Sequence, residues 1–135
     1  MIYIDSNIFL HPVLHDPTAV PKAARARARL TQVVKGKVEA YTSTLTWDEV
    51  VWTVRKFLGP AVAVAQGGLL LKAPNLRFLP VDSEVLYKAQ EIAERHRLKP
   101  RDCIHAATAL TNRITQILSY DPDFDAVPHL TRIEP

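Results

Sequence analysis

The chain carries four carboxylates beside apolar segments, in four separate parts of the sequence: Asp5, Glu49, Asp102 and Asp121. Asp5 follows the apolar residues 1–4, Glu49 lies in a Trp- and Val-rich stretch, and Asp102 begins an Ala-rich one. A charge beside a buried segment costs free energy unless a partner compensates it. Convergence of these acids from distant parts of a small protein therefore predicts a site for a hard cation, Mg²⁺ or Mn²⁺.

The composition suits a water-soluble enzyme or binding protein. The chain has 135 residues, of which 47% are apolar, and we expect one domain spanning residues 1–135. Its net charge of +3 is compatible with a nucleic-acid partner. The single Cys103 excludes an internal disulfide framework, and the longest weakly polar run, Pro60–Leu71, is too short to cross a bilayer. No signal peptide is evident, so we expect a cytoplasmic protein without a membrane partner.

Apolar periodicity predicts alternating strands and helices. Expected strands cover residues 2–4, 38–43, 76–81, 115–120 and 130–133. Expected helices cover residues 22–35, a segment from a Thr44 or Thr46 cap to Gly59, then 61–72, 83–97 and 101–113. The residues Ile8–Leu10 resume the apolar run of the first strand before Pro12. This alternation favours a parallel α/β sheet.

A parallel sheet would bring the four acids together. Ligands of such sheets bind outside the carboxyl ends of the strands, and both Asp5 and Asp121 follow a predicted strand. A helix after the second strand would start near the same edge and carry Glu49 toward it. The helix that begins at Asp102 could present its acid there as well.

Four short motifs resemble those of the PIN-domain family, in the family's order and over nearly the whole chain. They are Ile4–Asn7, Thr46–Val50, Pro100–Ala107 and Ser119–Phe124. The resemblance is to the small VapC-type toxin ribonucleases in particular. It implies a three-layer α/β fold with a five-stranded parallel sheet in the order 3-2-1-4-5 and helices on both faces.

The resemblance also implies a function. The protein would be a Mg²⁺- or Mn²⁺-dependent endoribonuclease, the toxin of a type II toxin–antitoxin pair, with RNA as substrate, a cognate antitoxin and a homodimeric assembly. The surplus of apolar residues around Trp47, Trp52 and the segment 65–71 offers a dimer interface. Carried over, Asp5, Glu49, Asp102 and Asp121 are the catalytic, metal-holding acids, with Asp123 as a candidate fifth ligand.

The surrounding residues suit this chemistry. A bound cation can activate water and polarise a phosphoryl oxygen, and a few carboxylates suffice to hold Mg²⁺. Ser6 and Asn7 could position a ligand or water, and Ser119 could do so less directly. His105 follows Asp102 by three positions and shares its helix face, where it could touch substrate or make a structural hydrogen bond.

The sequence leaves several alternatives open. Asp48 stands beside Glu49 and could be the second acid, and Glu49 could be a solvated helix residue. Asp5 and Asp121 could serve turns, and Asp102 could be a favourable charge at a helix N-terminus. A housekeeping RNA-processing nuclease and a catalytically silent RNA-binding or scaffolding module would share this fold. A phosphatase of the haloacid dehalogenase type would need an acid where Asn7 stands. A basic stripe of Lys22, Arg25 and Arg29 suits an RNA backbone or a solvated helix face equally well.

Overall fold

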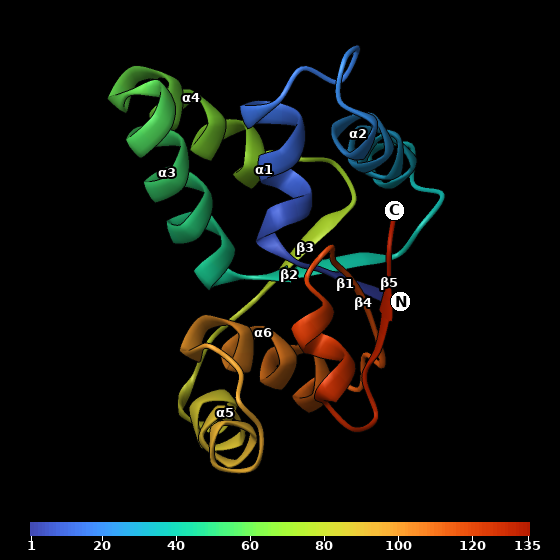
Figure 1. Cartoon of the computed structure of the whole chain (residues 1–135), viewed down its shortest axis with the longest axis vertical. Coiled ribbons are helices and arrows are strands. Elements are labelled where there is room, and N and C mark those ends of the chain that lie inside the picture. The colour runs from blue at the N-terminus through green and yellow to red at the C-terminus, as the bar shows by residue number, and fades with distance from the viewer.

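The chain folds around a parallel sheet that lies between two layers of helices (Figure 1). The computed structural model describes residues 1–135. The strands are β1 (Ile2–Ile4), β2 (Ala40–Ser43), β3 (Leu76–Leu79), β4 (Gln116–Leu118) and β5 (Thr131–Ile133). Their order is β3-β2-β1-β4-β5 and every neighbouring pair is parallel, which confirms the expected topology.

Helices cover both faces of the sheet, as expected. They are α1 (Ser6–Leu14), α2 (Pro21–Val34), α3 (Thr44–Leu58), α4 (Pro60–Leu71), α5 (Ser83–Arg95), α6 (Pro100–Thr111) and the 3₁₀ helix η1 (Pro122–Ala126). Figure 1 shows α1 to α4 on one side of the sheet, with α5, α6 and η1 on the other. No helix is long and apolar enough to span a membrane.

The central strand β1 is buried on both faces, which explains its unbroken apolar sequence. Ile2 and Ile4 pack into the core beneath α1 to α4, whereas Tyr3 packs into the core beneath α5 and α6. Because β1 lies between β2 and β4, its carboxyl end opens at the middle of the sheet edge. Asp5, the next residue, is therefore placed at the centre of the site.

The expectation for residues 8–10 needs correction, because they belong to α1 and do not continue the first strand. The Asp5 carboxylate accepts a hydrogen bond of 2.7 Å from the backbone N–H of Ser6, and it caps a helix that starts directly after β1. Pro12 lies inside this helix. The ring of Pro12 replaces the backbone N–H, so one helical hydrogen bond is lost, and the helix ends two residues later, at Leu14.

The start of α3 also differs from the expectation of a threonine cap. The residue before the helix is Ser43, whose side chain makes no capping bond, and Thr44 and Thr46 lie within α3. Thr46 bonds instead to the hydroxyl of Thr42 at 2.6 Å, and Thr42 donates to the Ile4 carbonyl at 2.8 Å. These buried hydroxyls tie the first turn of α3 to β1, which is how Glu49 comes to lie near Asp5.

Candidate active site

A polar cleft of about 550 Å³ opens at the carboxyl edge of the sheet. Six residues singled out from the sequence line it: Asp5, Ser6, Asn7, Glu49, Asp102 and Asp121. Three further lining residues were not predicted as site residues: Lys99, and Pro100 and Arg101 at the start of the third motif. The four expected acids thus share one cleft. Asp48, the alternative second acid, is exposed and does not line it.

Each acid reaches the cleft from a different element of the fold. Asp5 lies between β1 and α1, and Asp102 lies in the first turn of α6. Asp121 follows β4 and caps η1, where its side chain accepts a 2.9 Å hydrogen bond from the backbone N–H of Asp123. Glu49 projects from the second turn of α3, on the side facing β1.

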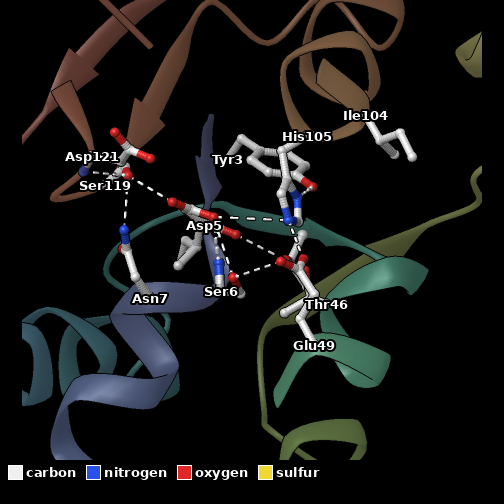
Figure 2. Close-up of polar contacts among 12 residues, drawn as sticks. Tyr3, Asp5, Ser6, Asn7, Thr46, Glu49, Ile104, His105, Ser119 and Asp121 are labelled. Atoms are coloured by element: carbon white, nitrogen blue, oxygen red, sulfur yellow. Dashed lines mark hydrogen bonds and ion pairs between the residues drawn. The ribbon is translucent and has the colours of Figure 1, made fainter. Parts of the chain in front are cut away.

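A buried histidine connects two of the acids (Figure 2). His105 has no exposed surface; its Nε2 hydrogen-bonds to Glu49 Oε1 and lies 3.8 Å from Asp5 Oδ1. Its Nδ1 lies 2.6 Å from the hydroxyl of Tyr3, which is also fully buried. His105 therefore has a structural role: its imidazole ring lies beneath the cleft and holds Glu49 in place.

The protonation of this network follows from its surroundings. Burial disfavours the charged imidazolium, but the hydrogen bond to Glu49 and the charge of Asp5 outweigh it and raise the pKa of His105. In the charged form both ring nitrogens donate, one to Glu49 and one to the oxygen of Tyr3. Burial also raises the pKa of Asp5, an effect opposed by His105 and by the Ser119 hydroxyl. One imidazolium would thus compensate two carboxylates, the buried Asp5 and the partly buried Glu49.

Ser119 orients Asp5 from the other side. Its hydroxyl donates a 2.6 Å hydrogen bond to Asp5 Oδ2, and accepts from Asn7 Nδ2 at 3.2 Å and from the backbone N–H of Asp121 at 3.0 Å. Ser6 links the same acid to Glu49, with its Oγ 3.4 Å from Asp5 Oδ1 and 3.3 Å from Glu49 Oε2. The hydroxyls of Ser6 and Ser119 thus contact Asp5 directly, and the Asn7 amide supports it through Ser119.

Three acids lack a cationic partner: Asp102 and Asp121 in the cleft, and Asp123 next to them. Carboxylate oxygens of Asp102, Asp121 and Asp123 lie within 4.8 Å of one another, and none of the three acids forms an ion pair. Partial burial, together with the negative charges of Asp5 and Asp121, raises the pKa of Asp102 to about 7. Oxygen donors at this spacing, strained by mutual repulsion, fit a hard divalent cation.

The repulsion predicts that Asp102→Asn stabilises the metal-free protein at pH 8. The shift in pKa corresponds to about 4 kcal/mol if taken in full. Because the side chain is only partly buried, we expect a gain on the order of 1–2 kcal/mol in the free energy of unfolding. Urea denaturation in EDTA measures this gain, with Asp48→Asn as the matched control that removes an exposed charge.

The difference in stability between wild type and Asp102→Asn should also depend on pH. Since the folded-state pKa of Asp102 is raised, its ionisation destabilises the fold above pH 7. As the pH falls through about 7, the folded protein takes up this proton and gains stability, until the unfolded chain is also protonated near pH 4. The advantage of Asp102→Asn should therefore fall to about half at pH 5.5 and vanish only near pH 4. An advantage that is equal at both pH values would show that charge repulsion is not its origin.

The fold is shared by known proteins, although no curated protein matches the chain. VapBC2 of Rickettsia felis, solved with a promoter DNA fragment, is 14% identical, with a TM-score of 0.75 over 99% of this chain and 98% of that one. VapC20 of Mycobacterium tuberculosis, described as a sarcin–ricin-loop-cleaving toxin, is 18% identical, with a TM-score of 0.74 over 93% and 94%.

A toxin–antitoxin complex from Klebsiella pneumoniae is 16% identical, with a TM-score of 0.67 over 97% of this chain and 96% of that one. Identities this low establish the common fold alone. Membership in a family rests on the sequence itself, since the model of the PIN domain matches residues 2–130. The order of the four motifs and the topology of the sheet agree with that match. The chain belongs to the PIN domain family.

Proposed function

We propose that the protein is a metal-dependent endoribonuclease, with Mg²⁺ or Mn²⁺ as cofactor, and the toxin of a type II toxin–antitoxin pair. The observation that carries the enzymatic part is the cluster of unpaired carboxylates on Asp102, Asp121 and Asp123, beside the buried Asp5 and the partly buried Glu49. A module that only bound RNA would gain nothing from concentrating negative charge where phosphates must approach. A cation-dependent hydrolase requires it.

Different residues of the cleft would bind the cation and activate the attacking water. Asp102 and Asp121 would hold the cation together with Asp5, while Asp123 completes the set from η1. A divalent cation bound there would polarise a phosphoryl oxygen and make water a better nucleophile at neutral pH. Glu49 is fixed by His105 and Ser6, so its free lone pairs can orient the attacking water and accept its proton. No side chain needs to act as a nucleophile.

The toxin assignment is supported by what the solved relatives are. The Klebsiella structure is a toxin–antitoxin complex, and the Mycobacterium protein is described as a sarcin–ricin-loop-cleaving toxin. We infer a cognate antitoxin for this chain, which would insert a Lys or Arg side chain into the acidic cleft. A housekeeping nuclease would have the same cleft but no such partner, and co-expression with the product of an adjacent small gene separates the two.

Cleavage of RNA should depend on a divalent cation. Purified protein incubated with labelled RNA is expected to cut internal phosphodiester bonds in Mg²⁺ or Mn²⁺, and to leave the RNA intact in EDTA. The cation should also raise the melting temperature, because it binds only the folded state. A silent RNA-binding module would bind the RNA in EDTA and leave it intact in every condition. Undiminished cleavage in EDTA would contradict the proposal.

A homodimer is expected through α3 and α4. Trp52, Phe57 and Leu69 are each more than half exposed on these helices. The two helices pack closely because Gly67 leaves room, since a Cβ there would lie 2.8 Å from Val51 Cγ2. This leaves an apolar ridge that a second copy could cover.

Light scattering at micromolar concentration should give the mass of two chains, and Trp52→Glu should reduce it to one. Tyr87→Glu is the matched control, because Tyr87 is an exposed aromatic residue on α5, across the sheet. A monomeric wild-type protein would exclude the interface.

A further inference from the structure

A basic segment lies between the acidic cleft and a second cavity. Residues 95–101 read Arg-His-Arg-Leu-Lys-Pro-Arg, with four Lys or Arg and no acid. They connect the end of α5 to the start of α6. Lys99 and Arg101 line the acidic cleft, while Arg95 and His96 line a cavity of about 430 Å³. One short segment therefore contributes cations to both cavities, and we call it the basic crossing.

The four cations of the basic crossing are free to bind a ligand. Arg95, Arg97, Lys99 and Arg101 are all exposed, and none forms an ion pair within the chain. This contrasts with Arg132, which is engaged by Asp125 at 2.9 Å and by Glu134 at 3.2 Å. Cations without internal partners are the ones that can exchange their counterions for phosphates.

The second cavity continues the same electrostatic character. It lies along α5, between that helix and the segment after η1, and its other basic residues are Lys88 and His129. The one acid in its wall, Glu91, is engaged by Lys88 at 3.4 Å. The wall also includes the apolar side chains of Ile92, Leu110 and Val127. Cations around an apolar floor suit a strand that carries both phosphates and bases.

The acidic cleft cannot itself supply the affinity for an RNA strand. Its carboxylates outnumber the basic groups that face them, so they repel a phosphate backbone until a cation is bound. An RNA that reaches the scissile position must therefore be held by cations beside the cleft. The basic crossing is adjacent to the cleft in space and continuous with it in sequence. The basic stripe of α2, in contrast, lies on the other side of the sheet.

We propose that the basic crossing and the cavity along α5 form the path of the RNA strand that leads to the cleft. The inference rests on the proposed ribonuclease function, because it assigns the substrate its route to that site. Arg95 ends α5 and Pro100 begins α6, so the four residues between them span at most about 14 Å, the length of about four phosphates of a stacked strand. Arg101 and Lys99 would contact phosphates beside the scissile bond, and Arg97 and Arg95 those farther along.

RNA affinity measured without catalysis tests the path. A 5′-fluorescein-labelled single-stranded RNA of 16 nucleotides is titrated in EDTA with wild-type protein and with Arg95→Gln/Arg97→Gln, and anisotropy is read at several salt concentrations. Neither arginine lines the acidic cleft. The matched control is Lys35→Gln/Lys37→Gln, which removes two exposed, unpaired cations between α2 and β2. Both variants lower the net charge equally.

The expected changes follow from counterion release. Each lost phosphate contact lowers the slope of log K against log salt by about 0.7, so the Arg95/Arg97 variant should lose about 1.4. At 0.1 M salt this corresponds to roughly 25-fold weaker binding. Arg95→Lys/Arg97→Lys keeps the charges and should bind nearly as wild type, which excludes a folding defect. The control variant should lose less than about threefold.

Equal losses in the Arg95/Arg97 variant and in the control would overturn the path, as would the absence of RNA binding by wild-type protein. If the Arg95/Arg97 variant kept its RNA affinity but lost an acidic partner protein, the surface would belong to that partner, and the RNA path would be wrong. Failure of the nuclease proposal has a different signature. It would appear as intact RNA in Mg²⁺ and Mn²⁺, whatever the affinities measured in EDTA.

Discussion

Replacement of Asp5 by Asn is expected to reduce RNA cleavage by more than about 100-fold, because its carboxylate is the centre of the cleft and a proposed ligand of the cation. Asp5 is 3% exposed, and both of its oxygens accept hydrogen bonds, from the Ser6 N–H and the Ser119 hydroxyl. An Asn side chain has the same shape and removes the negative charge. Cleavage rates at saturating Mg²⁺ give the effect directly.

The fold should survive this substitution. Burial raises the pKa of Asp5, so loss of its charge is favourable, while the amide group of Asn meets a Ser119 hydroxyl that already accepts two hydrogen bonds. These effects oppose one another, and we expect a net change on the order of 1 kcal/mol in the free energy of unfolding. Asp48→Asn is the control with full activity. Wild-type turnover by a folded Asp5→Asn protein would remove Asp5 from the catalytic set.

Replacement of His105 by Ala should be the most destabilising change in the site, costing about 3–5 kcal/mol. The substitution leaves Glu49 without its buried partner and Tyr3 with an unpaired hydroxyl, and it opens a space beneath the cleft. Urea denaturation measures the loss. Tyr3→Phe removes only the hydrogen bond at the far end of the network and should cost about 1 kcal/mol.

A double variant distinguishes the charge pair from simple packing. If His105 serves mainly to compensate Glu49, then Glu49→Gln should recover part of the stability lost in His105→Ala, with a coupling on the order of 1–3 kcal/mol. If the two substitutions are additive, His105 is a packing residue, and its bond to Glu49 does not stabilise the site. Activity alone cannot separate these cases, because both variants disturb Glu49.

The topology could be predicted from the sequence because the motifs and the strand pattern agree. The buried run before Asp5 and the one before Asp121 are strands β1 and β4, and their adjacency brings both acids to one edge. The segment after the first motif was harder to place. Ile8 to Leu10 looked like more strand because the apolar pattern of a buried helix and a buried strand are alike over three residues.

The site itself was predictable as a set of acids but not as a network. Sequence spacing put His105 on the face of Asp102, yet the bond that defines it runs to Glu49, a residue 56 positions away on another helix. Likewise, Ser119 appeared as a distant neighbour and proves to hold Asp5, 114 positions away. The basic residues at 99 and 101 carried a visible signal, since they flank a proline just before Asp102. The contacts of His105 with Glu49 and of Ser119 with Asp5 depend on tertiary packing, which no local sequence pattern encodes.

Calorimetric titration of Mn²⁺ tests most directly whether the cleft is a metal-dependent catalytic centre. Metal-free wild-type protein should bind the ion, and Asp121→Asn should bind it at least about tenfold more weakly, with Asp48→Asn as the unaffected control. The rate of RNA cleavage should rise and saturate over the same range of Mn²⁺ concentration as the binding. Full-rate cleavage by protein that has bound no divalent cation, or equal affinity in wild type and Asp121→Asn, would contradict this assignment.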